Sequence, residues 1–315
     1  MKILSRPKKN AEEYGKWAVN PYVGCSHGCL YCYLKKGPSG KYLGQDRPVL
    51  KTGIVSEEHA YHLAMAEILE NREQIIRDGG LFMTFTSDPC LNKTSWLFAK
   101  IATDCIRDHG IPVTLLTKCC TELSRWIDEL VTVSHHIDIH GEILKDYNYD
   151  NLSRLAVGYT LTGHDEFEPN APSNATRIKD MAHIRYFFGG DKFHVWASIE
   201  PVIDFYSSFK MILQALDAGC QHFKIGLMTR GTKVCRSGFT LDGKTFEPYD
   251  PARCLAFVQD VMQQTRDRAT VYWKQSFRDF IGGTGKHRLF SDDELHKIFD
   301  DYPNAVGKDW SMFSK

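Results

Sequence analysis

Short apolar runs alternate with longer amphipathic segments along most of the chain. The apolar runs that read as buried strands cover residues 81–86, 112–117, 156–161, 194–199, 222–227 and 270–273. A further short strand is expected near residues 17–22. Strand-like runs separated by helical segments are typical of βα units that build a parallel sheet. Because about six such units follow one another, the pattern predicts an α/β fold with a partial TIM-like barrel.

The segments between the runs carry helix signals. Ser56 precedes two glutamates, and apolar residues then recur at helical spacing up to Ile75. A hydroxyl in this position can cap the first turn, where acidic charge suits the helix dipole. A second amphipathic segment covers residues 209–216 and stops before Gly219. A third begins at Asp250, which is followed by proline at the first helical position.

Two segments depart from the regular alternation. Residues 134–154 are rich in charge and histidine, and we expect an insertion that contains a short helix over the site. Near the C-terminus, Ser291 is followed three residues later by Glu294, which predicts a capping box and a final helix. The chain is therefore expected to comprise a barrel domain at residues 1–281 and a C-terminal helical extension at residues 282–315, which is not a separate domain.

The composition is that of an ordinary globular protein. Hydrophobic residues make up 43% and charged residues 25%, and Lys+Arg and Asp+Glu are both 39. The balanced charge provides no global positive field for nucleic acid. The chain has no signal peptide and no membrane-length apolar run, so its 10 cysteines indicate a reducing compartment. We expect a cytoplasmic protein without a membrane partner.

Three cysteines stand close together. Cys25, Cys29 and Cys32 have the spacing CxxxCxxC. Thiolates on one tight loop can hold three irons of a [4Fe–4S] cluster and leave the fourth iron open to another ligand. The alternative is a structural zinc site, which needs four ligands and would recruit His27, another cysteine or a distant histidine. A disulfide framework fits less well with a reducing compartment.

The residues around these cysteines carry a family resemblance. Residues 20–33 read NPYVGCSHGCLYCY, which resembles the signature of the radical S-adenosylmethionine (SAM) superfamily and is similar to its spore photoproduct lyase and DNA repair photolyase-like branch. The resemblance implies a partial (β/α)6 barrel with the cluster loop after the first strand. It also implies that SAM chelates the open iron and is cleaved to a 5′-deoxyadenosyl radical, which takes hydrogen from a substrate. The electron would come from a donor such as a flavodoxin or a ferredoxin.

The same resemblance implies cofactor-binding residues at the ends of the strands. The candidates are Ser87, Asp88, Lys118, Thr160, Thr162, Arg177 and Glu200. Lys118 would meet the SAM carboxylate, and Glu200 would hold ribose hydroxyls or a substrate amine. Each candidate also has a structural interpretation. The Ser-Asp pair can form a turn, the lysine can face water, the Glu200 carboxylate can form a surface salt bridge, and Arg177 can pair with Glu168.

Three further residues are candidates for the radical steps, namely Tyr31, Tyr33 and Cys90. The two tyrosines flank the last cluster ligand, and tyrosines at the matching positions of the lyase take part in radical hand-back. Their alternative role is hydrophobic shielding of the cluster. The lyase has a hydrogen-donating cysteine where this chain has Phe85, which argues against photoproduct repair itself. Cys90 could offer a thiol from nearby, or it could pack as a small apolar residue.

These residues together predict a radical SAM enzyme with an unidentified substrate. A nucleic-acid-related substrate is one candidate, and a peptide or a small molecule is another. The rival from a different class is a non-catalytic nucleic-acid-binding protein that holds zinc or an iron–sulfur cluster.

Overall fold

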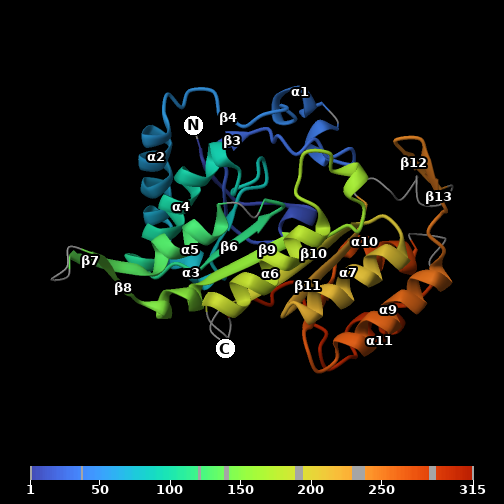
Figure 1. The fold of residues 1–315 in the computed structure, drawn as a ribbon. Helices are drawn as coiled ribbons and strands as arrows, with labels where there is room; N and C mark the ends of the chain where they lie inside the picture. The colour runs from blue at the N-terminus through green and yellow to red at the C-terminus, as the bar shows by residue number, and fades with distance from the viewer. Residues whose placement is uncertain are drawn as a thin grey trace.

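A sheet of mostly parallel strands forms the centre of the fold (Figure 1). The computed structural model describes residues 2–36, 38–119, 122–137, 142–188, 194–228, 238–283 and 289–313. Within these residues the sheet has eight strands in the order β1-β2-β5-β6-β9-β10-β11-β14. The strands are β1 (Leu4–Ser5), β2 (Ala18–Val19), β5 (Leu81–Met83), β6 (Val113–Thr117), β9 (Leu155–Thr160), β10 (His194–Val202), β11 (His222–Leu227) and β14 (Thr270–Trp273). Strand β1 is antiparallel to β2, and every other neighbouring pair is parallel.

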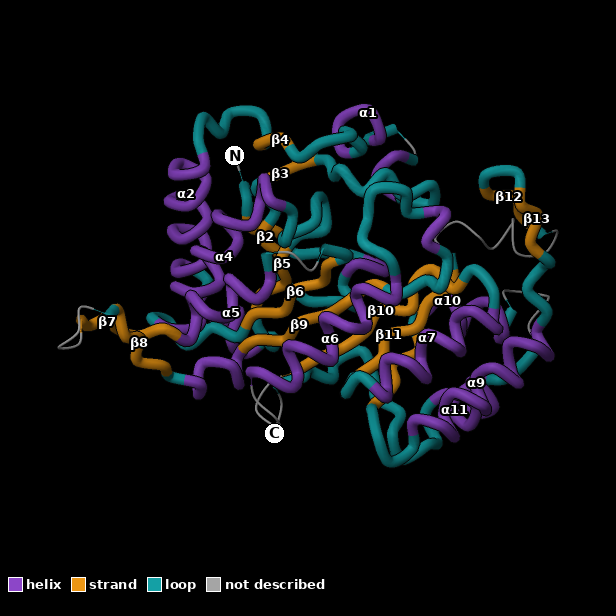
Figure 2. Tube along the Cα trace, in the orientation of Figure 1, coloured by secondary structure: helices purple, strands orange, loops and turns teal. Residues whose placement is uncertain are grey.

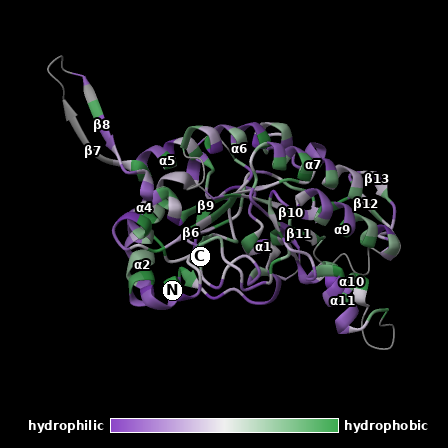
Figure 3. Ribbon diagram, turned by 90° about the horizontal axis from the view of Figure 1, so that it is seen from below, coloured by the Kyte–Doolittle hydropathy of each residue, from purple (hydrophilic) through white to green (hydrophobic). Residues whose placement is uncertain are grey.

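Helices connect the strands and cover the outer face of the sheet (Figure 2). They are α1 (Gly40–Leu43), α2 (Glu57–Glu70), α3 (Arg72–Arg77), α4 (Asn92–Arg107), α5 (Leu123–Val131), α6 (Asn174–Phe188), α7 (Phe205–Asp217), α9 (Pro251–Thr265), α10 (Gln275–Gly282) and α11 (Asp292–Phe299). The side chain of Ser56 caps α2, and that of Asp250 caps α9, as predicted. Figure 3 shows α2, α4, α5, α6, α7 and α9 in succession around the outside of the strands.

The structure confirms the predicted strand pattern and the α/β partial barrel. Each of the six apolar runs overlaps a strand of the sheet, and β2 lies within residues 17–22. Strand β5 is shorter than its run because the backbone leaves the sheet after Met83. Thr84 has a φ of 60°, which an extended strand does not allow. The residues that follow are therefore free to form the turn that carries Ser87 and Asp88.

The strand side chains alternate between two apolar regions. Outward-facing residues pack with the helices in one large core. Inward-facing Phe82, Ala156 and Trp196 pack with Ala18 in a second, smaller cluster inside the barrel. Gly158 pairs in register with Trp196, and a Cβ at this glycine would come within 2.1 Å of the indole. The indole fills the barrel interior only because its neighbour has no side chain.

The C-terminal extension packs on the barrel. Helix α11 begins with the predicted capping box, in which the Glu294 N–H donates to Ser291 Oγ at 3.2 Å and the Ser291 N–H donates to the Glu294 carboxylate at 2.8 Å. Further along, Ala305 forms a parallel bridge with Val271 of β14. The expected boundary after residue 281 falls in the last turn of α10.

The last described residues cover the amino-terminal end of the barrel interior. Trp310 stacks on His222, the first residue of β11, with ring centroids 4.3 Å apart. Phe313 lies edge-on to His194, the first residue of β10, at 5.5 Å. Met312 and Phe313 also pack against the inner apolar cluster. The tail therefore packs across the end of the barrel that is opposite to the carboxyl ends of the strands.

The insertion at residues 134–154 does not cover the site. Strands β7 (Thr132–Ile137) and β8 (Ile143–Tyr147) form an antiparallel hairpin, and the 3-10 helix Tyr149–Arg154 follows. Because this short helix leads directly into β9, the insertion lies at the amino-terminal end of that strand. The hairpin projects away from the sheet (Figure 3). The expectation of a helix over the site is therefore wrong in its position, although a short helix is present.

Two further antiparallel strand pairs lie outside the main sheet. Strand β3 (Tyr22–Val23) pairs with β4 (Val49–Leu50), and β12 (Phe239–Leu241) pairs with β13 (Lys244–Phe246). No helix in the described part of the chain combines the length and the apolar character that a membrane crossing requires.

We expect Gly158→Ala to destabilise the fold by about 1–3 kcal/mol, because an added methyl group would force Trp196 out of a filled interior. Urea unfolding followed by circular dichroism measures this change. Gly307→Ala is the control, since nothing lies within 4 Å of a Cβ at that position. Equal stability of the two variants would contradict the packing of the indole against Gly158.

Candidate active site

The cysteine loop follows strand β3 near the carboxyl end of the first parallel strand. Gly24 begins the loop with a φ of 87°, and a Cβ here would come within 2.4 Å of the Arg47 carbonyl oxygen. Only glycine fits such a backbone position without strain. The Cys25 N–H donates to the Gln45 carbonyl at 3.0 Å. The segment around α1 and β4 therefore holds the first cysteine in place.

The other side of the loop docks on the segment after β9. The Leu30 N–H donates to the Phe167 carbonyl at 3.0 Å, and the Asn170 N–H donates to the His27 carbonyl at 3.1 Å. The Asn170 side chain also donates to the Ser26 carbonyl at 3.1 Å. Backbone hydrogen bonds thus fix the loop between two segments that are far apart in the sequence.

Asp88 connects the loop to the ends of β5 and β6. Its carboxylate lies 3.0 Å from His27 Nε2 and accepts hydrogen bonds from the Thr117 hydroxyl at 2.7 Å and the Lys118 N–H at 2.8 Å. The Cys90 N–H donates to the same carboxylate at 2.9 Å. Burial alone would raise the pKa of Asp88, but the His27 contact and the hydrogen bonds lower it below its usual value. Asp88 lies where the sequence predicted, with its carboxylate engaged by four protein groups.

Glu168 forms a second buried anchor beneath the loop. The Tyr31 hydroxyl donates to its carboxylate, and the Arg177 guanidinium pairs with it. The side chains of Glu168 and Arg177 have no exposed surface. Lys118 Nζ lies 3.8 Å from the same carboxylate and 5.5 Å from the centre of the Tyr31 ring. Two cations therefore face one carboxylate, and both are held against the cysteine loop.

Arg177 uses its other donors on backbone carbonyls. Its Nη1 donates to the Thr160 carbonyl at 2.7 Å, and its Nε donates to the Pro172 carbonyl at 2.9 Å. The arrangement is the structural pair with Glu168 that the sequence left open as an alternative. Arg177 thus holds the end of β9 in place. Each of its three guanidinium nitrogens donates a hydrogen bond to an oxygen atom of the protein.

Ser87, Thr160 and Thr162 lie at the strand ends in different surroundings. Thr160 is buried at the end of β9, and the buried Thr162 hydroxyl accepts the His164 N–H at 3.3 Å. Ser87 Oγ is buried and has no hydrogen-bond partner among the described residues. A buried hydroxyl of this kind normally meets a ligand or an ordered water. Of these three residues, Ser87 therefore has the side chain best suited to receive a ligand.

Glu200 faces the barrel interior near the end of β10. The Lys274 ammonium donates to its carboxylate at 2.7 Å, and the Tyr14 hydroxyl donates to it as well. The same hydroxyl lies 2.8 Å from Ser198 Oγ. Lys274 Nζ also lies 4.2 Å from the centre of the Tyr14 ring. The predicted residue is thus part of a buried ionic cluster and not of a surface salt bridge.

The sequence analysis missed several members of this cluster. Lys224 donates to the Glu13 carbonyl at 2.7 Å, and burial together with the charge of Lys274 lowers the pKa of Lys224 to about 7. Its position could have been found from β11, where polar His222 and Lys224 alternate with apolar residues. Side chains that alternate in this way lie on one face of a strand. Tyr14 had no comparable signal, because it lies between β1 and β2 and not on a strand.

Tyr33 and Cys90 have contrasting positions. The Tyr33 hydroxyl donates to the Phe85 carbonyl, so this tyrosine bridges the cysteine loop and the strand end. The Phe85 ring stacks on Phe82 with centroids 4.4 Å apart. Cys90 has no exposed surface and lies beneath Asp88. The structure therefore brings the Tyr33 hydroxyl to the backbone of Phe85, and it does not bring the Cys90 thiol to the surface of the site.

The three cysteine thiols are available to bind an iron–sulfur cluster, but they are not already arranged as a binding site for a single metal ion. In the described ranges, no group of three or more His, Cys, Asp and Glu side chains could hold a metal ion. Cys29 is buried, whereas Cys25 and Cys32 are partly exposed. Burial, reinforced by Asp88, raises the pKa of Cys25 to about 12, so a bound metal is needed to hold this group as a thiolate. Three thiols on one loop, with an unpaired hydroxyl at Ser87, fit an iron–sulfur cluster that carries a polar ligand.

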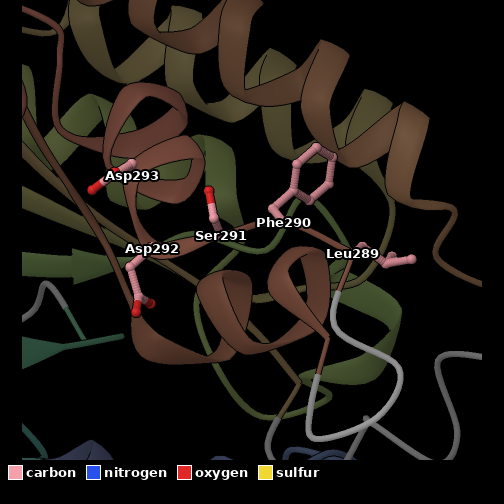
Figure 4. A pocket seen from close by; sticks show the side chains of 5 residues that line it. All are labelled: Leu289, Phe290, Ser291, Asp292 and Asp293. Carbon is pink, nitrogen blue, oxygen red and sulfur yellow. The ribbon is translucent and has the colours of Figure 1, made fainter.

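Two hollows lie outside the barrel interior. One, of about 690 Å³, is lined by Ser26, Arg47, Pro48, Val49, Leu91, Asn92, Lys93 and Cys119. The other is lined by five consecutive residues at the start of α11, and Figure 4 shows their side chains pointing apart. Only the first of these two hollows borders the cysteine loop.

A histidine–carboxylate cluster lies beside the segment that carries Glu168. His164 Nε2 lies 2.5 Å from the carboxylate of Asp204, the N-cap of α7, and His164 Nδ1 lies 3.2 Å from Glu166. Lys244 of β13 donates to Glu166 at 2.7 Å. Burial alone would lower the pKa of His164, but the two carboxylates raise it above its usual value.

Comparison with known proteins identifies the fold. No family model matches the chain, and no curated protein does. The chain is similar to a solved structure of a spore photoproduct lyase mutant, with a TM-score of 0.57 and 12% identity over 86% of this chain and 79% of that chain. It is also similar to that lyase complexed with dinucleoside spore photoproduct, with a TM-score of 0.55 and 13% identity over 86% of this chain and 80% of that chain. The chain therefore has the fold of spore photoproduct lyase, and the resemblance seen in the cysteine loop is confirmed at the level of the fold.

Arg177→Met is expected to destabilise the protein by roughly 3–5 kcal/mol, because it leaves the buried Glu168 carboxylate without its main counter-charge. Urea unfolding gives the free-energy difference. Asp217→Asn is the control, since it breaks an exposed pair with Arg268 at 2.7 Å and should change stability by less than about 0.5 kcal/mol. Similar losses in the two variants would contradict the buried anchor.

The contribution of His164 to stability should depend on pH. A folded pKa above the unfolded value of about 6.5 gives a contribution that is complete below that value and is lost as the pH rises through the folded pKa. His164→Gln is therefore expected to destabilise the protein more at about pH 5.5 than at about pH 8.5. Urea unfolding of wild type and variant at both pH values measures the difference. An equal loss at the two pH values would show that the charge on His164 contributes nothing.

Proposed function

We propose that the chain is a radical SAM enzyme. The observation that carries this proposal is the CxxxCxxC loop, which lies at the carboxyl ends of parallel strands in the fold of spore photoproduct lyase. Functional groups of such barrels gather at this end of the strands. We also propose that the protein works in the reducing cytoplasm with an electron donor such as a flavodoxin or a ferredoxin.

Cys25, Cys29 and Cys32 would hold three irons of a [4Fe–4S] cluster. When bound, the cluster and SAM supply one-electron cleavage of the sulfonium to a 5′-deoxyadenosyl radical, which removes a hydrogen atom from the substrate. Lys118 is suited to the carboxylate of SAM. Burial alone would lower the pKa of Lys118, but charges at Cys29 and Glu168 raise it, so the side chain stays cationic. Ser87 is suited to a polar group of the same ligand, because its hydroxyl lacks a protein partner within the described ranges.

The chain's own residues would position the substrate in the barrel interior. Tyr14, Glu200 and Lys274 line this space with groups that can donate and accept hydrogen bonds. Fixed polar groups of this kind orient a substrate and replace part of its hydration. Trp310 and Phe313 pack at the opposite end of the strands, where they support the inner face from below.

A nucleic-acid-related substrate is the first candidate within this proposal. Its support is that one similar structure is of spore photoproduct lyase complexed with dinucleoside spore photoproduct. Phe85 offers no thiol, and the Cys90 thiol is fully buried, so a hydrogen atom returned to the product would come from another group. The Tyr33 hydroxyl is suited to that role, because it lies on the Phe85 carbonyl. A substrate other than a photoproduct is therefore proposed.

Replacing any one of Cys25, Cys29 and Cys32 by alanine should abolish cluster binding, because each thiolate holds its own iron. Iron and sulfide analysis after anaerobic reconstitution measures the cluster, and the release of 5′-deoxyadenosine from SAM measures the reaction. Cys105→Ala is the control, since Cys105 is fully buried in the outer core and should leave the iron content unchanged. Zinc without iron or sulfide would instead support a structural metal site. A cluster without release of 5′-deoxyadenosine would support a non-catalytic protein.

A further inference from the structure

The segment after the cysteine loop carries a local excess of positive charge. Residues 33–51 contain five lysines and arginines and a single acidic residue, Asp46, whereas the whole chain has 39 of each sign. Lys35, Lys36, Lys41 and Arg47 are exposed. We call these four residues the basic collar.

The collar lies directly beside two of the three cysteines. The Lys35 N–H donates to the Cys32 carbonyl at 3.3 Å, and the Cys25 N–H donates to the Gln45 carbonyl at 3.0 Å. Both of these cysteines are partly exposed. A protein that contacts the collar would therefore come close to the exposed edge of the proposed cluster site.

A hollow continues the same surface. The hollow of about 690 Å³ has Arg47 and Lys93 among its lining residues, together with apolar Pro48, Val49 and Leu91. None of its described lining residues is acidic, and none comes from the inner face of the barrel. An apolar patch with charged groups around it is the usual composition of a protein interface.

We propose that the basic collar and this hollow form the docking surface for an acidic one-electron donor protein. The inference rests on the proposed function. One electron would pass from the reduced donor to the cluster, so that the donor is oxidised by one electron and the cluster is reduced by one. Electron transfer weakens steeply with distance, which favours docking beside Cys25 and Cys32. Opposite charges would speed the encounter, and a small interface suits a partner that must leave after each transfer.

Nucleic acid is the other macromolecule that a basic surface could bind. The geometry favours the donor protein, because a substrate has to reach the barrel interior, whereas the collar and the hollow lie outside it.

Charge reversal tests the proposal. The test variant carries Lys36→Glu, Lys41→Glu and Arg47→Glu, and it leaves Lys35 intact because that residue pairs with Asp46 at 2.6 Å. The control variant carries the same change in charge at three exposed lysines on outer helices, Lys179→Glu, Lys210→Glu and Lys297→Glu. Circular dichroism compares the folding of both variants with wild type. A second variant with glutamine at the three collar positions provides the test if charge reversal impairs folding.

The first measurement is binding of a fluorescently labelled acidic flavodoxin to the reconstituted protein by anisotropy. We expect the collar variant to weaken binding by about tenfold or more and the control variant to change it by less than about twofold. Added salt should weaken binding to wild type more than binding to the collar variant. The second measurement is 5′-deoxyadenosine release. Release driven by the flavodoxin should fall in the collar variant, whereas release driven by dithionite should be unchanged.

Several results would overturn the docking surface. One is a collar variant that binds the flavodoxin as wild type does. Another is wild type that binds neither the flavodoxin nor an acidic ferredoxin. Loss of binding to single-stranded DNA in the collar variant, with flavodoxin binding retained, would assign the surface to nucleic acid. If wild type releases no 5′-deoxyadenosine with dithionite but still binds the flavodoxin through the collar, the proposed function fails and the docking surface stands.

Discussion

The buried Glu168 carboxylate is the contact on which the candidate site depends. It meets Tyr31 of the cysteine loop, Arg177 of α6 and Lys118 at the end of β6. A buried carboxylate is tolerated only where cations and hydrogen bonds compensate it, so these partners have to remain together. The loop, the helix and the strand end are therefore fixed relative to one another. The Tyr31 contact with Glu168 adds a side-chain anchor to the backbone hydrogen bonds that hold the thiol-bearing loop.

The alternation of the strands explains why the chemistry lies inside the barrel. In β10, Trp196, Ser198 and Glu200 point inward, while the residues between them pack with the helices. In β11, Lys224 lies on the same inner face, in register with Ser198. On this inner face Trp196 precedes Ser198 and Glu200, so the ionic cluster around Glu200 lies on the side of the indole toward the carboxyl end of β10. The indole itself packs with Ala18, Phe82 and Ala156.

The sequence predicted the strands, the helix caps and the cysteine loop because each depends on residues that are neighbours in the chain. Asp88 and Lys118 were located through the resemblance, but the partners of Asp88 were not, because His27 reaches it only after the loop folds back on the strand ends. Tyr14 lies 184 residues before Ser198, and no local pattern connects them. The position of the β7–β8 hairpin was also missed. Amino-acid composition can indicate that a segment is inserted, but it does not indicate at which end of the barrel the segment lies.

The packing of the C-terminal tail has a consequence for the barrel core. Trp310 and Phe313 contact the first residues of β11 and β10, and Met312 and Phe313 also pack against the inner apolar cluster. The last part of the chain therefore completes a core that the strands begin. A chain that ended before Trp310 would leave apolar side chains of the inner cluster exposed to water.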